Sequence, residues 1–138
     1  MRIMSLDLGT KRIGMAISDE LFFTAQGADT IYRSSLDRDL AAIKKAIDEN
    51  GVCEVVVGLP INMDGTQGQK SKETLVFIDE LKKVTGVTIK TWDERLTTVQ
   101  AERVLLEADV SRAKRRKSID KLAAQIILQS YLDSRKRA

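Results

Sequence analysis

Short apolar runs separated by polar turns predict five strands along the chain. Residues 2–8 and 13–18 are two such runs lying close together, which is typical of a β-hairpin, and residues 24–33 predict a weaker third strand. Residues 52–59 form an uninterrupted apolar run, which favours a strand buried on both faces. Residues 87–92 alternate enough to predict a strand nearer the edge of the sheet.

A period of three to four residues predicts helices at 36–50, at 71–84, after Thr97 and at 117–134. Glycines follow the first two helices and provide their stop signals. The positions that we expect to face the core are, in chain order, Leu36, Leu40, Ile43 and Ile47; Phe77, Ile78, Leu81 and Val84; Ala101, Val104, Leu105 and Ala108; and Ile119, Leu122, Ala123, Ile126 and Ile127.

This order of elements predicts an α/β fold. Three consecutive strands favour an antiparallel meander, and the two strand–helix–strand units after it favour right-handed parallel crossovers. We therefore expect a mixed five-stranded sheet, a three-strand meander plus two parallel strands, with helices on both faces. The length of 138 residues corresponds to a single domain, residues 1–138, large enough to fold without disulfides or structural metals.

The composition excludes several kinds of chemistry. The chain has no histidine and one cysteine, Cys53, so imidazole bases, Ser-His pairs and zinc sites built on histidine or several cysteines are excluded. A catalytic metal would need oxygen ligands, which suit Mg²⁺ or Mn²⁺. Because Asp7 interrupts the N-terminal apolar run and no apolar stretch approaches ~20 residues, we expect a cytoplasmic protein without a membrane span.

The charge is unevenly distributed. The whole chain carries +3, whereas residues 110–138 carry +7 and the first 109 residues carry −4. A basic segment on a mildly acidic body favours a polyanionic partner, although a charge run by itself is also typical of a solvated helix end. The basic residues of this segment are Arg112, Lys114, Arg115, Arg116, Lys117, Lys121, Arg135, Lys136 and Arg137.

Acidic residues in three segments of the chain are candidates for a catalytic site. Asp7 lies near the end of a predicted central strand, where a carboxylate is costly unless it is paired or metal-bound. Asp93 and Glu94 directly follow another strand, and sites in open sheets form beyond the carboxyl ends of parallel strands. Asp120 lies one turn into the last helix, on a face shared with Ala124. Each also has an ordinary structural explanation: a turn hydrogen bond, an ion pair with Arg95, or a favourable helix-dipole interaction.

Together these features favour metal-dependent phosphodiester chemistry. Carboxylates from three distant segments can hold two divalent ions ~4 Å apart, and the basic segment would hold a nucleic-acid backbone. The loop at 59–66 could present Asn62 and backbone N–H groups to a phosphate, although it is not a Walker sequence. The six aromatic residues lie mostly in apolar runs, which argues against a base-stacking platform.

Four sequence blocks resemble the YqgF family, also called RuvX-type or Holliday junction resolvase-like proteins and known as pre-16S rRNA nucleases. The blocks are Leu6-Asp7-Leu8-Gly9-Thr10-Lys11-Arg12-Ile13-Gly14; Val57-Gly58-Leu59-Pro60-Ile61-Asn62-Met63-Asp64-Gly65-Thr66; Trp92-Asp93-Glu94-Arg95-Leu96-Thr97-Thr98; and Asp120-Lys121-Leu122-Ala123-Ala124 with Ile127-Leu128-Gln129 downstream. They cover essentially the whole chain, and Ser5, where we expect glycine or an apolar residue, is a small departure.

The resemblance implies a ribonuclease H-like fold and a nuclease that uses divalent metal ions, with Asp7, Glu94 and Asp120 as catalytic and metal-binding residues. It also implies maturation of the 5′ end of pre-16S rRNA. Our candidates for contacts with nucleic acid are Lys11, Asn62, Arg95, Arg112, Lys114, Arg115, Arg116 and Lys117. We expect the protein to act as a monomer or weak homodimer.

Three other readings compete with this one. A DNA nuclease that resolves Holliday junctions would use the same site. Asp-Leu-Gly-Thr also resembles the first phosphate loop of the actin, Hsp70 and sugar-kinase group, whose members usually need two such domains, and 138 residues supply one. The last alternative is an RNA-binding module for ribosome assembly without catalytic activity.

Of the neighbours Asp93 and Glu94, we expect Glu94 to be the metal ligand. The resemblance points to it, and successive side chains at the end of a strand point in opposite directions. Trp92 and Glu94 would then share a side of the sheet, while Asp93 would pair with Arg95 or cap the turn.

Overall fold

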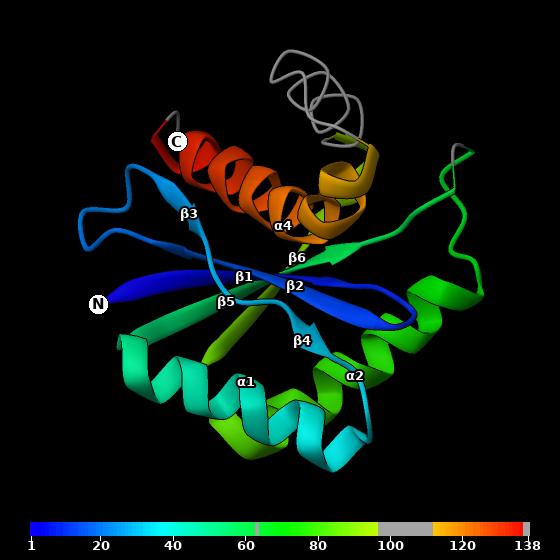
Figure 1. The fold of residues 1–138 in the computed structure, drawn as a ribbon, viewed down its shortest axis with the longest axis horizontal. Coiled ribbons are helices and arrows are strands. Elements are labelled where there is room, and N and C mark those ends of the chain that lie inside the picture. Colours follow the sequence, from blue (N-terminus) through cyan, green and yellow to red (C-terminus); the bar gives the residue numbers. More distant parts are fainter. Residues whose placement is uncertain (63, 97–111, 137–138) are drawn as a thin grey trace.

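The fold is a mixed sheet with helices on both faces (Figure 1). The computed structural model describes residues 1–62, 64–96 and 112–136, and for residues 96, 112–121 and 136 it describes the backbone only. The elements are β1 (Arg2–Leu8), β2 (Arg12–Ser18), β3 (Ala25–Gly27), β4 (Ile31–Tyr32), α1 (Leu36–Asn50), β5 (Val52–Leu59), α2 (Gln69–Thr85), β6 (Thr88–Asp93), a 3₁₀ turn (Glu94–Leu96) and α4 (Arg112–Lys136).

The sheet has the order β3-β2-β1-β5-β6, with β4 also paired to β2. Strands β1 and β2 are antiparallel, and β5 is parallel to both β1 and β6. This confirms the predicted fold class. The expected third strand at 24–33 is divided into β3 and β4, because the Ala28-Asp29-Thr30 segment between them leaves the ladder and aspartate disfavours a strand.

Two hydrophobic clusters lie on opposite faces of the sheet. Helices α1 and α2 cover one face, where Leu6 and Val57 are fully buried, and α4 covers the other, where Val56 is fully buried (Figure 1). Strand β5 is therefore buried on both faces, as its apolar run predicted. No helix in the described part of the chain is long and apolar enough to cross a membrane.

Helix α1 begins and ends where the sequence predicted. The Ser35 side chain accepts a hydrogen bond from the N–H of Arg38, and Gly51 ends the helix with a φ of 63°. Leu40, Ile43 and Ile47 are buried as predicted, whereas Leu36 is 46% exposed. That expectation was wrong because the first helical turn has not yet reached the core.

Helix α2 is buried through a different set of positions from the predicted one. Phe77, Ile78 and Leu81 are buried as expected, but Val84 is 41% exposed because the last turn leads out towards Gly86. At the other end, Ser71 is fully buried and its hydroxyl donates to the carbonyl of Pro60. A small polar residue there ties the start of the helix to the end of β5.

The buried face of α4 differs from the predicted one. Ile127 is buried as expected, but Leu122, Ala123 and Ile126 are only half-buried, and the core positions are Ala124, Ile127, Leu128, Tyr131 and Leu132. Apolar residues surround much of this helix, so the sequence period alone did not select the correct face. The side chain of Ile119, and the predicted helix with Ala101, Val104, Leu105 and Ala108, lie outside the described residues.

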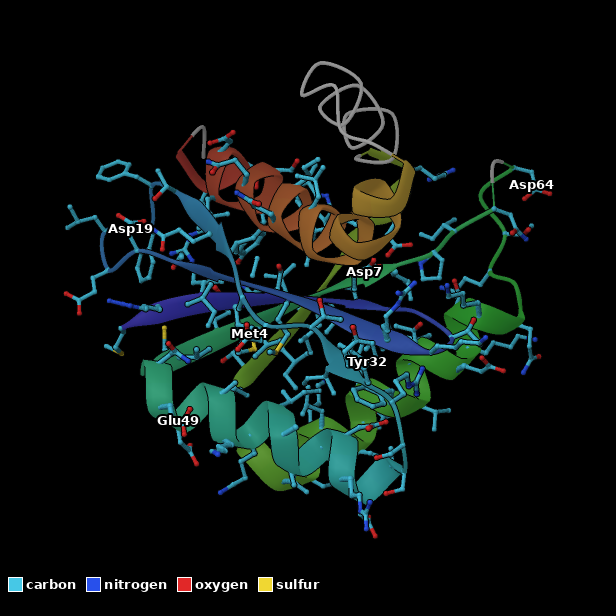
Figure 2. The ribbon with its side chains drawn as sticks, viewed as in Figure 1. Met4, Asp7, Asp19, Tyr32, Glu49 and Asp64 are labelled. Carbon is cyan, nitrogen blue, oxygen red and sulfur yellow. The ribbon has the colours of Figure 1, made fainter. Side chains whose placement is uncertain are left out.

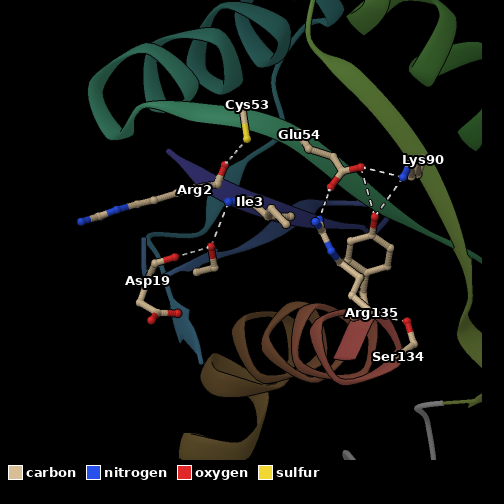
Figure 3. A network of polar contacts seen from close by, with 10 residues as sticks. Arg2, Ile3, Asp19, Cys53, Glu54, Lys90, Ser134 and Arg135 are labelled. Carbon is tan, nitrogen blue, oxygen red and sulfur yellow. Dashed lines mark hydrogen bonds and ion pairs between the residues drawn. The ribbon is translucent and has the colours of Figure 1, made fainter. Parts of the chain in front are cut away.

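A buried ion cluster joins β5, β6 and α4 at the amino-terminal end of β5 (Figure 3). The Glu54 carboxylate lies 2.9 Å from Lys90 Nζ and 3.0 Å from Arg135 Nη1, and it accepts a hydrogen bond of 3.1 Å from the Tyr131 hydroxyl. Glu54 is 8% exposed, so these partners compensate for the loss of its hydration.

Replacing Glu54 by glutamine should destabilise the fold by about 1–2 kcal/mol, because a buried carboxylate loses hydrogen bonds to charged groups. Glu49→Gln is the matched control, since Glu49 is exposed and lies 3.9 Å from Lys45. Urea unfolding followed by circular dichroism measures both variants. Equal midpoints would show that the Glu54 cluster contributes nothing to stability.

Candidate active site

Asp7 lies near the carboxyl end of β1, on the α4 side of the sheet (Figure 2). Alternation along the strand puts it on the same face as Ile3 and Ser5. The Ser5 hydroxyl donates a 2.5 Å hydrogen bond to the carbonyl of Ala124, which fixes β1 against α4 two residues before Asp7. Because β1, β5 and β6 are parallel, their carboxyl ends meet at one edge of the sheet.

Glu94 joins Asp7 at this edge. It directly follows β6, and its carboxyl group is hydrogen-bonded to the side chain of Asp7. Strand β5 lies between β1 and β6, so the two acidic side chains meet across the end of the central strand. Residues 87 positions apart in the sequence thus form a carboxyl pair.

A glycine makes this meeting possible. A Cβ atom at Gly58 would lie 2.6 Å from Glu94 Oε1 and 2.7 Å from Ile127 Cδ1, closer than van der Waals contact allows. Glu94 therefore occupies the space that a side chain on β5 would fill. Gly58 lies in one of the matching sequence blocks, but this role could not be predicted from the sequence, because the spatial requirement exists only once the strands are paired.

The carboxyl pair is electrostatically unusual. Burial, and after it the hydrogen bond and negative charge of Asp7, raise the pKa of Glu94 to about 8, while the positive charge of Lys70 acts in the opposite direction. At neutral pH Glu94 is therefore mostly protonated and can donate a hydrogen bond to Asp7. A divalent cation would replace that proton as the positive charge between the two groups.

Asp93 has a different role from its neighbour. Its carboxylate lies 2.7 Å from Arg95 Nη2 and accepts further hydrogen bonds from the Arg95 side chain and backbone N–H. These contacts hold the pKa of Asp93 below its usual value. The expected division is thus present in the structure: Asp93 pairs with Arg95 and caps the turn, and Glu94 faces Asp7.

The backbone of α4 approaches the same edge at position 120. Tyr131 contacts Glu54, which pairs in register with Ile3, and Ala124 contacts Ser5, so α4 runs antiparallel to β1. One further helical turn, from 124 to 120, advances about 6 Å, and the two residues from Ser5 to Asp7 advance about 6.6 Å. The side chain of Asp120 lies outside the described residues.

The candidate nucleic-acid contacts lie in three places. Lys11 is exposed in the turn between β1 and β2. The Asn62 side-chain amide donates a hydrogen bond to the Thr66 hydroxyl. The backbone carbonyl of Asn62 accepts one from the Arg95 guanidinium, which is also paired with Asp93. The remaining candidates occupy the first turns of α4, with side chains outside the described residues: Arg112, Lys114, Arg115, Arg116 and Lys117.

The donors at this edge fit a hard divalent cation. Two carboxyl groups meet at hydrogen-bond distance, and oxygen ligands of this kind suit Mg²⁺ or Mn²⁺. The described side chains contain no group of three or more His, Cys, Asp or Glu residues arranged for a metal. A third carboxylate would have to come from beyond them.

Without divalent ions, the free energy of unfolding should fall as the pH rises from about 5 to 8. The unfolded chain loses the Glu94 proton near its ordinary pKa of 4.5, whereas the folded protein keeps it up to about 8, so folding becomes less favourable over this range. Asp7→Asn removes one cause of the raised pKa, and it should flatten the slope and stabilise the protein at pH 8.

Thermal unfolding in chelator across this pH range measures the effect. Asp48→Asn, which removes an exposed carboxylate paired with Lys44, is the control and should keep the wild-type slope. The same slope in the Asp7→Asn protein would show that the carboxyl pair does not control it.

Comparison with known proteins identifies the family. The RuvX family profile, described as Holliday junction resolvase, matches residues 1–134. A protein of Myxococcus xanthus provisionally named pre-16S rRNA nuclease is 56% identical over 134 residues, covering 97% of this chain and 89% of its own. One of Halothermothrix orenii with the same name is 56% identical over 133 residues, covering 96% and 95%.

Solved structures show the same fold at low sequence identity. Thermus thermophilus RuvC in complex with a Holliday junction substrate matches with a TM-score of 0.58 and 15% identity, covering 99% of this chain and 96% of its own. Fowlpox virus resolvase with junction DNA matches with a TM-score of 0.57 and 17% identity, covering 97% and 98%. These likenesses confirm the ribonuclease H-like fold, and the profile and the close relatives show that the chain belongs to the RuvX family of nucleases.

Proposed function

We propose that this chain hydrolyses phosphodiester bonds of the 16S rRNA precursor during maturation of its 5′ end, using divalent ions held by Asp7, Glu94 and Asp120. The observation that carries the proposal is the Asp7–Glu94 pair, two carboxyl groups that meet at the end of the central strand. Asp120 is included because the α4 backbone approaches this edge at its position. Its role also follows the family resemblance.

The three acidic residues would hold the ions and give up a proton as they do so. Mg²⁺ or Mn²⁺ held by these residues would supply water activation and stabilisation of the leaving oxygen. Glu94, which is mostly protonated at neutral pH, would give up its proton on becoming a ligand. No histidine is needed for any of these tasks, in agreement with the composition.

Basic residues would hold the backbone of the substrate. Residues 112–117 occupy the first turns of α4, on the carboxyl-edge side of Ala124, and include five of the candidate cations. Lys11 and Asn62 lie on turns that follow β1 and β5, where they would add one positive charge and one amide group around the edge. Recognition would rest mainly on backbone charge and shape.

Two substrates are supported by specific observations. Relatives 56% identical over almost the whole chain are named for pre-16S rRNA, which favours the RNA. The family profile is described by Holliday junctions, which makes junction DNA the second candidate. We propose that the protein acts in the cytoplasm as a monomer or weak homodimer.

Glu94→Gln should lower metal-dependent cleavage by about a hundredfold or more, because it removes a metal ligand. RNA affinity should stay nearly unchanged, because Glu94 makes no contact with the RNA backbone. Asp93→Asn is the matched control: it breaks the pair with Arg95 and should reduce stability more than cleavage. Cleavage of a pre-16S rRNA fragment and of junction DNA is measured with Mg²⁺, Mn²⁺ and chelator. If the two variants exchanged these phenotypes, the ligand would be Asp93.

Gly58→Ala should lower cleavage by about ten- to a hundredfold, because the added methyl group displaces the Glu94 carboxyl and the end of Ile127. Gly51→Ala is unsuitable as a control because Gly51 has a positive φ, so Gly68→Ala, whose Cβ would meet only Asn62 at 3.5 Å, is used instead. Wild-type activity in a folded Gly58→Ala protein would contradict the proposed position of Glu94.

A further inference from the structure

A groove of about 710 Å³ lies beside the carboxyl edge, on the side of the sheet covered by α1 and α2. Its walls come from the end of β1 and the following turn, from the segment before α1, and from the first turns of α2. The residues that matter here are Leu8, Thr10, Arg33, Lys70, Glu73 and Phe77. Leu8 directly follows Asp7 but points to the opposite face of the sheet, so the groove and the catalytic pair approach the carboxyl edge from its two sides.

The groove is lined by two basic side chains, and one of them, Arg33, has a structural role. The Arg33 guanidinium donates a 2.8 Å hydrogen bond to the carbonyl of Gly9, lies 3.6 Å from the buried Asp39 carboxylate, and stacks 5.7 Å from the centre of the Phe77 ring. Arg33 therefore forms a fixed wall that holds the turn after β1 in place.

The other basic side chain, Lys70, can bind an anion. Lys70 is exposed, and among the described residues its ammonium group has no hydrogen-bond or ion-pair partner. Its charge nevertheless acts on Glu94, so it lies on the side of the groove nearest the catalytic pair. Glu73, one turn further along α2, carries the opposite charge. The charges that line the groove therefore favour one anionic group, bound beside Lys70.

The remaining lining suits the rest of a nucleotide. Leu8 and Phe77 give an apolar floor, and Thr10 and Gln69 contribute a hydroxyl and an amide. The volume is within the roughly 300–1,000 Å³ of small-ligand sites. One free cation beside an apolar floor and a few polar groups fits a nucleoside phosphate.

We propose that this groove binds the nucleotide adjacent to the scissile phosphodiester, with the Lys70 ammonium on its phosphate and its base or sugar against Leu8 and the Arg33 guanidinium that covers Phe77. The inference rests on the proposed nuclease function. It gives Lys70 the role of a substrate-binding residue that sets which linkage reaches the carboxyl pair.

The test combines a substitution in the protein with one in the substrate. Binding is measured by fluorescence anisotropy in the Asp7→Asn background, which prevents cleavage, with Lys70→Gln and the control Lys72→Gln. Lys72 is exposed on the same helical turn and does not line the groove. The ligands are pre-16S rRNA oligonucleotides in which each linkage in turn is a neutral methylphosphonate. Cleavage by the wild-type protein maps the scissile linkage.

We expect Lys70→Gln to weaken binding about five- to tenfold and to reduce the slope of log affinity against log salt by about 0.7, the value for one phosphate contact with a single strand. Lys72→Gln should change neither. A methylphosphonate next to the scissile linkage should weaken binding to the Asp7→Asn protein by a similar factor, but should cause no further loss when Lys70 is also glutamine.

Other results overturn the inference. Equal effects of Lys70→Gln and Lys72→Gln, or an unchanged loss at every methylphosphonate position, would show that Lys70 contacts no particular phosphate. Binding of ATP alone in the groove, without any coupling in the oligonucleotide series, would make it a mononucleotide site. If the wild-type protein cleaves no substrate, the proposed function itself fails, whereas cleavage without coupling refutes only the role of Lys70.

Discussion

The burial of β5 on both faces is the constraint that organises this molecule. Val55, Val56 and Val57 have no exposed surface, so β5 can place polar groups only towards its ends. Its parallel pairing with β1 and β6 brings the ends of three strands together at each edge of the sheet. Charged side chains therefore gather at two opposite edges, separated by the apolar centre.

The carboxyl groups at the two edges have different partners. At one edge Glu54 is compensated by Lys90, Arg135 and the Tyr131 hydroxyl, which together fasten β6 and α4 to the centre of the sheet. At the other edge Asp7 and Glu94 face each other, and burial, followed by the hydrogen bond and negative charge of Asp7, raises the pKa of Glu94 to about 8. The first edge stabilises the fold, whereas the second holds two acidic groups close together, and a bound cation would reduce their repulsion.

The features that depend on local sequence pattern could be predicted from the sequence. The strands around Asp7 and Glu94 and both ends of α1 follow from alternation, caps and glycines. The buried face of α4 was missed because apolar residues on several sides make the period ambiguous, and contacts with the sheet, such as Ser5 with Ala124 and Tyr131 with Glu54, select it. The pairing of Asp93 with Arg95 could be expected from alternation, but the space at Gly58 and the position of Lys70 depend on tertiary packing. The metal-binding roles of Asp7, Glu94 and Asp120 stay predictions.

The hydrogen bond between Ser5 and Ala124 also bears on how the protein folds. It joins residues 119 positions apart, and contacts of such long range are costly in loop-closure entropy and slow to form. The first strand can therefore meet its helical partner only after nearly the whole chain is available. Partly folded chains would contain Asp7 on a hairpin without the last helix. The carboxyl edge that faces α4 would therefore be completed late in folding.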